Sequence, residues 1–257
     1  MKNVLTEKKD NIGIVTVNRP EQLNSMNSET RSEMAQAFTD MGLDESVNVI
    51  LLTGAPSKAF IAGADIKDFL KNEIENQEQM RKDWIVTEII SNLNKPVIAM
   101  IDGFCLGGGL EVAMACDIRI ASNRTKLGQP EINIGIIPGA GGTQRLTNLA
   151  GEGRAMELIL TGRMMDAEEA QNYGILNYIF EPAELEKKTM ELARTIAEKS
   201  TFATERAKKS IKAAAKMNLE DGLKFEREMF VECLNSDDGI EGITAFIEKR
   251  KPEFKGK

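Results

Sequence analysis

Three adjacent glycines at positions 107–109 constrain this chain more than any other feature of its sequence. They lie between an apolar run at residues 96–101 and a mostly apolar segment at residues 110–117, a pattern typical of a strand, a turn and a helix. Because glycine has no Cβ atom, a ligand can approach the backbone of such a turn closely. The open N–H groups at the start of the helix carry partial positive charge, so the turn predicts a site for a developing anion.

Two glutamates follow this turn in the sequence. Glu111 falls in the first turn of the predicted helix, and Glu131 follows Pro130 in a predicted loop. A glutamate at the start of a helix usually only complements the helix dipole, and a glutamate after a proline is usually a turn residue. Glu111, however, stands among apolar side chains, where a buried carboxylate needs a partner or a function. Two carboxylates and a free N–H group can together polarise a carbonyl and move a proton.

A phosphate-binding loop is the main alternative for the glycine turn. The dinucleotide pattern G-x-G-x-x-G fails, because a match started at Gly107 ends on Val112 and one started at Gly139 ends on Gln144. The sequence also lacks the Gly-Lys-Ser/Thr of a P-loop. An oxyanion hole therefore fits the turn better.

The chain has no histidine, which removes the commonest general base and the commonest metal ligand. Ser-His-Asp and Cys-His mechanisms within one chain are excluded. The three cysteines, Cys105, Cys116 and Cys233, form no C-x-x-C pair, and we expect them to be small buried residues. Their spacing offers no zinc site, so no metal is predicted. Acid–base chemistry therefore falls on Asp, Glu, Lys, Tyr or Cys.

Length and charge narrow the class of protein further. The 257 residues suffice for one large domain or a domain with an appendage. A net charge of −7 argues against nucleic acid as the main partner. No apolar run approaches the roughly 20 residues of a membrane helix. Residues 1–6 show neither a signal-peptide core nor an arginine-rich presequence, so we expect a cytoplasmic protein, although a chain whose presequence had been removed would look the same.

The order of the predicted elements indicates an α/β fold. Residues 11–18 and 47–53 have strand patterns, and Ser28 between them can cap a helix. From residue 189 onward nearly all of the sequence has helical spacing. We therefore expect a mixed α/β unit at residues 1–188 and an all-helical region at residues 189–257. These patterns alone predict an ordinary layered α/β arrangement.

Five motifs surround the glycine turn. In chain order they are Lys95-Pro96-Val97, Gly107-Gly108-Gly109-Leu110-Glu111, Cys116-Asp117, Gly128-Gln129-Pro130-Glu131 and Pro138-Gly139-Ala140-Gly141-Gly142. Together they closely resemble the crotonase superfamily, and within it the enoyl-CoA hydratases, and the likeness continues over nearly the whole chain. It implies a crotonase-like core, a spiral of β-β-α turns. A C-terminal all-helical oligomerisation region would follow, packed between the subunits of a homotrimer or a dimer of trimers.

The resemblance also implies roles for individual residues. Glu111 and Glu131 would be the catalytic carboxylates, and the N–H groups of Ala64 and Gly108 would form the oxyanion hole. Gly139 would help to hold the reacting water. The segment around Ala64 would by itself be an ordinary strand-to-helix turn, and the glycine turn downstream favours the functional interpretation. The residues implied to bind coenzyme A are Ala62, Asp65, Ile66, Lys67, Phe246 and Lys249. For the last two, a basic cluster that complements a helix C-terminus is the alternative.

The implied reaction is the reversible addition of water to a trans-2-enoyl-CoA such as crotonyl-CoA, giving a 3-hydroxyacyl-CoA, or the reverse dehydration. Other crotonases, such as enoyl-CoA isomerases, often keep only one of the two carboxylates, so the pair favours a hydratase. The pair and the acidic net charge also argue against an RNA-binding or non-catalytic relative. No cofactor is implied, because coenzyme A arrives as part of the acyl-CoA substrate. Residues 68–93 would help to shape the acyl pocket.

Overall fold

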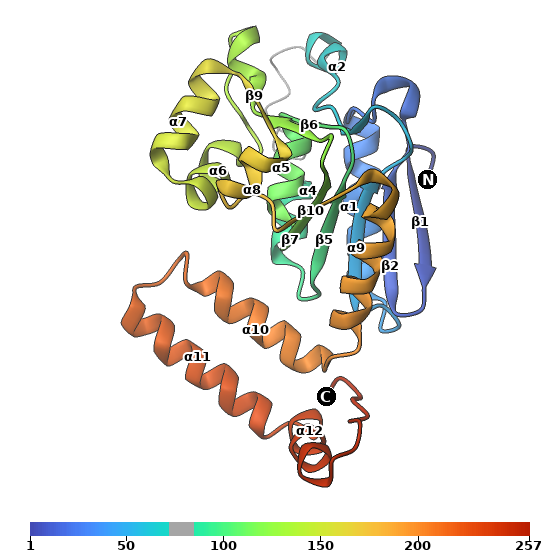
Figure 1. The fold of residues 1–257 in the computed structure, drawn as a ribbon, viewed down its shortest axis with the longest axis vertical. Coiled ribbons are helices and arrows are strands. Elements are labelled where there is room, and N and C mark those ends of the chain that lie inside the picture. Colours follow the sequence, from blue (N-terminus) through green and yellow to red (C-terminus); the bar gives the residue numbers. More distant parts are fainter. Residues whose placement is uncertain (72–84) are drawn as a thin grey trace.

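The computed structural model describes residues 1–71 and 85–257, and two β-sheets form its centre (Figure 1). The larger sheet has the order β1-β2-β3-β5-β7-β10, and the smaller has the order β4-β6-β8-β9. Strands β1 and β2 pair antiparallel, as do β8 and β9, and the other strand pairs are parallel. The strands are β1 Val4–Lys9, β2 Ile12–Val17, β3 Val49–Gly54, β4 Ala59–Ile61, β5 Val97–Ile101, β6 Phe104–Leu106, β7 Ile118–Ser122, β8 Lys126–Gly128, β9 Met164–Asp166 and β10 Tyr178–Phe180.

Three successive turns of the chain each contribute one strand to each sheet. Strand β3 is followed by β4, β5 by β6, and β7 by β8, and each pair leads into helical structure. The helices that follow are α2 Ile66–Lys71 after β4, α5 Gly108–Ala115 after β6, and η2 Pro130–Ile134 with α6 Gly142–Ala150 after β8. This confirms the β-β-α spiral. The layered arrangement expected from the patterns alone is wrong, because the second strand of each pair belongs to a separate sheet.

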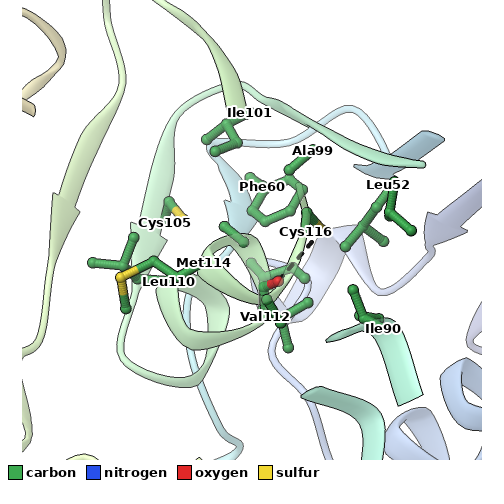
Figure 2. Packing of buried hydrophobic residues seen from close by; sticks show 14 of the residues in the cluster. Leu52, Phe60, Ile90, Ala99, Ile101, Cys105, Leu110, Val112, Met114 and Cys116 are labelled. Atoms are coloured by element: carbon green, nitrogen blue, oxygen red, sulfur yellow. Dashed lines mark hydrogen bonds between the residues drawn. The ribbon is translucent and has the colours of Figure 1, made fainter. Parts of the chain in front are cut away.

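The central strands bury both of their faces. Ile50 and Leu52 of β3 lie in the core that also contains Phe60 (Figure 2), whereas Val49 and Leu51 lie in a second core beneath α9 Pro182–Ala197. Successive residues of a strand point to opposite faces, so a wholly apolar strand such as β3 is stable only between two layers. The first core also encloses Cys105 and Cys116, as expected, whereas Cys233 is only half-buried.

Helix α5 packs directly on the backbone of β4. Every residue from Gly109 to Ala115 is buried. A Cβ atom on Gly109 would lie 2.1 Å from the carbonyl oxygen of Ile61, so only glycine allows this approach. Gly107, which precedes the helix, has a φ of +52°, a conformation that also favours glycine.

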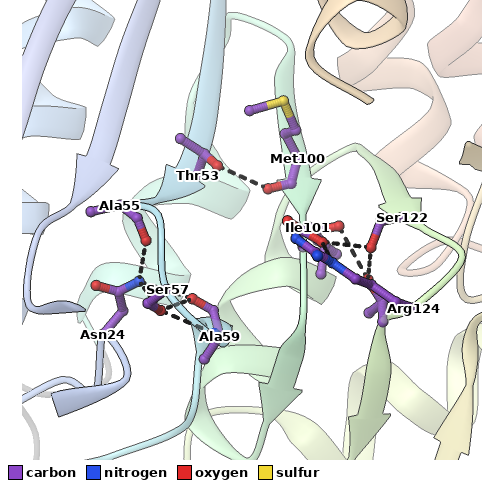
Figure 3. Close-up of polar contacts among 11 residues, drawn as sticks. Asn24, Thr53, Ala55, Ser57, Ala59, Met100, Ile101, Ser122 and Arg124 are labelled. Carbon is purple, nitrogen blue, oxygen red and sulfur yellow. Dashed lines mark hydrogen bonds and ion pairs between the residues drawn. The ribbon is translucent and has the colours of Figure 1, made fainter. Parts of the chain in front are cut away.

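The loop before α1 (Ser28–Leu43) is fastened to the connection between β3 and β4 (Figure 3). The Asn24 side chain is fully buried, and its Nδ2 donates to the carbonyl oxygens of Ala55 and Ala59, both at 2.9 Å. Asn27 is the N-cap of α1, because its Oδ1 accepts a hydrogen bond from the Thr30 N–H at 2.8 Å. The expectation that Ser28 caps this helix is therefore wrong by one residue.

Helices α10 Thr201–Ala213, α11 Leu219–Leu234 and α12 Asp237–Glu248 stand apart from the two sheets (Figure 1). Helix α9 spans residues 182–197 and packs on the larger sheet. The boundary expected between residues 188 and 189 therefore falls inside a helix of the core. Helix α10 is joined to the core by the buried Lys208, whose Nζ lies 2.6 Å from Asp117 Oδ2 and donates to the Lys95 carbonyl oxygen at 2.7 Å. The remaining helices are η1 Pro20–Gln22, α4 Ile85–Asn92, α7 Glu152–Thr161 and α8 Ala167–Asn172.

We expect Gly109→Ala to lower the free energy of unfolding by about 2–3 kcal/mol, because the new methyl group must push α5 away from Ile61. Gly153→Ala in α7 is the matched control. Nothing lies within 4 Å of its Cβ position, so this variant should gain about 0.5 kcal/mol. Urea unfolding measures both values, and equal stability of the two variants would contradict the close packing of α5.

Candidate active site

The backbone N–H groups of Ala64 and Gly108 lie close together at the start of α5. In the bridge between Met26 and Ala64, Met26 pairs with the Gly63 carbonyl and the Asp65 N–H, both at 2.9 Å, so the Ala64 N–H points away from it. Nothing in residues 1–71 and 85–257 accepts a hydrogen bond from this N–H group. Its nitrogen lies 3.6 Å from the position that a Cβ atom would take on Gly108, and Gly108 itself begins a helix, where N–H groups lack intrahelical partners.

The segment that carries Ala64 is held on both sides. Gly63 has a φ of +114°, which turns the chain between β4 and α2. Arg19 donates from Nη2 to Asp65 Oδ2 at 3.2 Å and from Nη1 to the carbonyl oxygen of Ser25. These contacts fix the direction of the Ala64 N–H.

Glu111 is a buried carboxylate with one oxygen held and one oxygen open. Glu111 is only 3% exposed, and its Oε1 accepts hydrogen bonds from the Ala140 and Gly142 N–H groups, both at 2.7 Å. No hydrogen bond from the described residues reaches Oε2, which lies 3.9 Å from the Cβ position of Gly108. Burial raises the pKa of Glu111, while the two N–H groups and the positive charge of Arg145 oppose this rise.

Glu131 approaches the same turn from the other side. It lies on η2, and its Oε1 is 2.8 Å from the Cβ position of Gly107, so any side chain at residue 107 would collide with the carboxylate. The fully buried Gln129 points its amide nitrogen at Glu131, 3.0 Å from Oε1 and 3.1 Å from Oε2, because the opposite orientation would set two oxygens against each other. Burial, together with the negative charge of Glu111, raises the pKa of Glu131 to about 7.

The structure brings the central residues of the predicted site together. Glu111 and Glu131 flank the glycine turn, and Ala64 adjoins Gly108. Gly139 directly precedes the two N–H groups that hold Glu111. The roles assigned to these residues stay predictions.

The residues predicted to bind coenzyme A fall into two separate groups. Ala62 and Asp65 flank the Ala64 segment, and the exposed Ile66 and Lys67 begin α2. The other two residues, Phe246 and Lys249, are exposed on or just after α12, at the opposite end of the molecule from α2 (Figure 1). One chain therefore does not bring the two groups together. Of the region predicted to shape the acyl pocket, residues 72–84 lie outside the described residues.

Sequence patterns missed the residues that hold the carboxylates. Gln129 directly precedes Pro130 and Glu131 in a motif that we interpreted only for its glutamate. Ala140 and Gly142 follow Gly139 in the same loop and could have been noticed as N–H donors, because that loop is rich in glycine. Arg19 gave no signal beyond marking the end of a strand.

No group of three His, Cys, Asp or Glu residues that could hold a metal ion occurs in residues 1–71 and 85–257. Within the same part of the chain, no helix is long and apolar enough to cross a membrane. A surface hollow of about 480 Å³ lies in the C-terminal region, lined in part by Phe202, Val231 and Lys257, and none of its lining residues is a predicted site residue.

The β-β-α spiral, with two carboxylates at one glycine turn, defines a crotonase-fold protein. The crystal structure of an enoyl-CoA hydratase from Bacillus anthracis superposes with a TM-score of 0.95 at 38% identity, covering 99% of this chain and 100% of that one. Residues 7–257 match the enoyl-CoA hydratase/isomerase family, and the chain belongs to this family.

Two named relatives are similar over nearly their full length. The short-chain-enoyl-CoA hydratase of Clostridium acetobutylicum is 42% identical over 254 residues, and the crotonyl-CoA hydratase of Syntrophomonas wolfei is 38% identical over 254 residues. Each alignment covers 98% of this chain and 97% of the relative. The similarity therefore extends through both the spiral core and the helical C-terminal region.

We expect Glu131→Gln to stabilise the protein by about 1–2 kcal/mol above pH 7, a value reduced for the partial exposure of the carboxylate. The pKa of Glu131 is raised from 4.5 to about 7 in the folded protein, so the folded state keeps a proton that the unfolded state releases in this interval. The parent protein therefore loses stability as the pH rises from 4.5 to 7, and the neutral amide of the variant removes this loss.

Urea unfolding at pH 5 and pH 8 tests this expectation, with the exposed Glu152→Gln as the control. The advantage of Glu131→Gln should grow between the two pH values, and that of the control should not. An advantage that stays constant would show that Glu131 has an ordinary pKa in the folded protein.

Proposed function

We propose that this enzyme adds water reversibly to trans-2-enoyl-CoA thioesters such as crotonyl-CoA, giving 3-hydroxyacyl-CoA. One observation carries the proposal. Glu111 and Glu131 approach the adjacent residues Gly108 and Gly107 of one turn, beside two N–H groups that are free to bind an oxygen. Membership of the enoyl-CoA hydratase/isomerase family and the names of its full-length relatives support the same reaction.

The thioester carbonyl binds at the start of α5. The N–H groups of Ala64 and Gly108 donate to its oxygen and stabilise the enolate-like charge that develops there. Removal of one such donor typically costs about 3–4 kcal/mol of transition-state stabilisation in other enzymes. The partial positive charge at the start of a helix adds to this stabilisation.

The two carboxylates hold one water molecule and divide the proton transfers between them. Two N–H groups and the Arg145 guanidinium oppose the rise that burial causes in the pKa of Glu111, so we assign Glu111 as the base that takes a proton as the water oxygen attacks C3. Glu131, whose pKa is raised to about 7, suits the acid that protonates C2 near neutral pH. Isomerisation would require only one carboxylate, so the pair favours hydration.

We expect Glu111→Gln and Glu131→Gln each to lower kcat for crotonyl-CoA hydration by at least about 100-fold, because an amide cannot exchange the proton. The chain has no histidine to replace either carboxylate. Loss of the absorbance of the conjugated thioester measures the rate, with Glu152→Gln as the control. A near-parental rate in either variant would remove that glutamate from the mechanism.

The enzyme also assembles, in this proposal, into a homotrimer or a dimer of trimers. Helix α11 has no buried residue in the isolated chain, and Leu219 and Phe230 are 79% and 60% exposed. Helix α12, which carries the exposed Phe246, lies at the opposite end of the molecule from α2, so Phe246 would reach the coenzyme A bound by a neighbouring subunit. The prediction also includes an acyl-CoA substrate, a cytoplasmic location, and no nucleic-acid or membrane partner.

Sedimentation equilibrium should give a mass of three or six times 28.4 kDa. Phe230→Asp should shift the distribution toward the monomer, because a charge would be buried in an apolar contact. A stable monomer with full hydratase activity would contradict the proposed assembly and the role of Phe246.

A further inference from the structure

The loop that holds Glu111 has almost no side chains of its own. Residues 139–142 are three glycines and one alanine, a composition that fixes little backbone conformation by itself. The loop nevertheless presents the Ala140 and Gly142 N–H groups to one oxygen of Glu111, both at 2.7 Å. An external contact must therefore keep these two groups in place.

Arg145 of α6 supplies this contact. Its side chain folds back along the helix, and Nη1 donates to the Ala140 carbonyl oxygen at 3.0 Å. That carbonyl belongs to the peptide unit between the two that donate to Glu111. Gly141 has a φ of +103°, and a Cβ atom there would lie only 1.8 Å from Nη1, so the guanidinium fills the space beneath the loop.

The other side of the guanidinium is anchored to α4. Nη2 donates to Ser91 Oγ at 3.0 Å and approaches the Thr87 carbonyl oxygen at 3.5 Å. The backbone of Ser91 is held in turn, because its carbonyl oxygen accepts a hydrogen bond from Lys212 Nζ of α10 at 2.6 Å. Arg145 therefore connects the glycine loop to a helix that is itself fixed.

We propose that Arg145 is a positioning residue for Glu111. It fixes the peptide units that hold Glu111 Oε1, and Oε2 is thereby directed toward the glycine turn. This inference rests on the proposed hydration reaction, because its kinetic test is the hydration of crotonyl-CoA. Arg145 makes no contact with the reacting atoms in this account and acts only through the loop.

The charge of Arg145 provides an independent readout. Among the described residues, the charged groups that act on Glu111 are Glu131 on η2 and Arg145 on α6. Arg145 also faces Glu88 on α4 and the Cys116 thiol at the end of α5. The two N–H groups and the Arg145 charge all lower the pKa of Glu111. Loss of Arg145 should therefore make the pair take up its second proton at a higher pH.

The test compares Arg145→Gln and Arg145→Lys with Arg124→Gln, an exposed arginine paired with Asp102. Arg145→Gln should lower kcat by about 10–100-fold with little change in KM, and should move the acidic limb of the kcat profile up by about one pH unit. Arg145→Lys keeps the charge but cannot bridge both acceptors, so its kcat should fall while its acidic limb stays nearer the parental position. Arg124→Gln should match the parent.

Parental kcat and pH profile in Arg145→Gln would overturn the proposal, as would a fall in kcat with an unmoved acidic limb. If the parent protein fails to hydrate crotonyl-CoA, the proposed function is wrong. A crystal structure of Arg145→Gln then tests the positioning role by itself. Loss of the hydrogen bonds from Ala140 and Gly142 to Glu111 would support the positioning role, and their retention would overturn it.

Discussion

The structure depends on a direct contact between two pieces of backbone. Helix α5 begins with glycines and packs on the end of β4 without intervening side chains, with the Cβ position of Gly109 only 2.1 Å from the Ile61 carbonyl oxygen. This contact brings the start of the helix beside the strand that leads to Ala64. The N–H groups of Ala64 and Gly108 come from segments 44 residues apart in the chain, and this contact brings them together. The glycine turn is therefore first a packing feature, and the proposed oxyanion hole depends on it.

The same turn places a carboxylate where burial is costly. Glu111 lies in a helix whose other core-facing residues are apolar, and an unpaired charge there would destabilise the fold. Two N–H groups of the glycine loop and the nearby Arg145 offset this cost. Glu131 is held instead by the amide of Gln129, and the negative charge of Glu111 helps to raise its pKa. The two carboxylates therefore lie in different surroundings, and the proposed mechanism assigns one as the base and the other as the proton donor.

The sequence predicted the centre of this site from local chemistry. The apolar run, three glycines and a helix with a glutamate in its first turn were sufficient to place Glu111 and Gly108 on one turn, and the fold confirms that strand–turn–helix order. The spiral was not predictable from the same patterns, because strands such as β4, β6 and β8 have three residues each and are too short to show a period. Family resemblance, and not periodicity, predicted that part of the fold.

The supporting contacts were hidden for a different reason. Arg145 reaches back five residues to the Ala140 carbonyl and across to Ser91, 54 residues away. Such contacts depend on how helices pack, and a single sequence does not show how they pack. The N-cap of α1 was missed by one residue because Asn27 and Ser28 are both good caps, and only the backbone conformation distinguishes them.

A crystal structure with a bound 3-ketoacyl-CoA, which has the thioester but cannot be hydrated at a C2–C3 double bond, tests the central claim most directly. The account predicts the thioester oxygen about 2.7–3.1 Å from both the Ala64 and Gly108 nitrogens, with C3 between the carboxylates of Glu111 and Glu131. A thioester oxygen bound by other groups, or a C3 atom remote from both carboxylates, would contradict it.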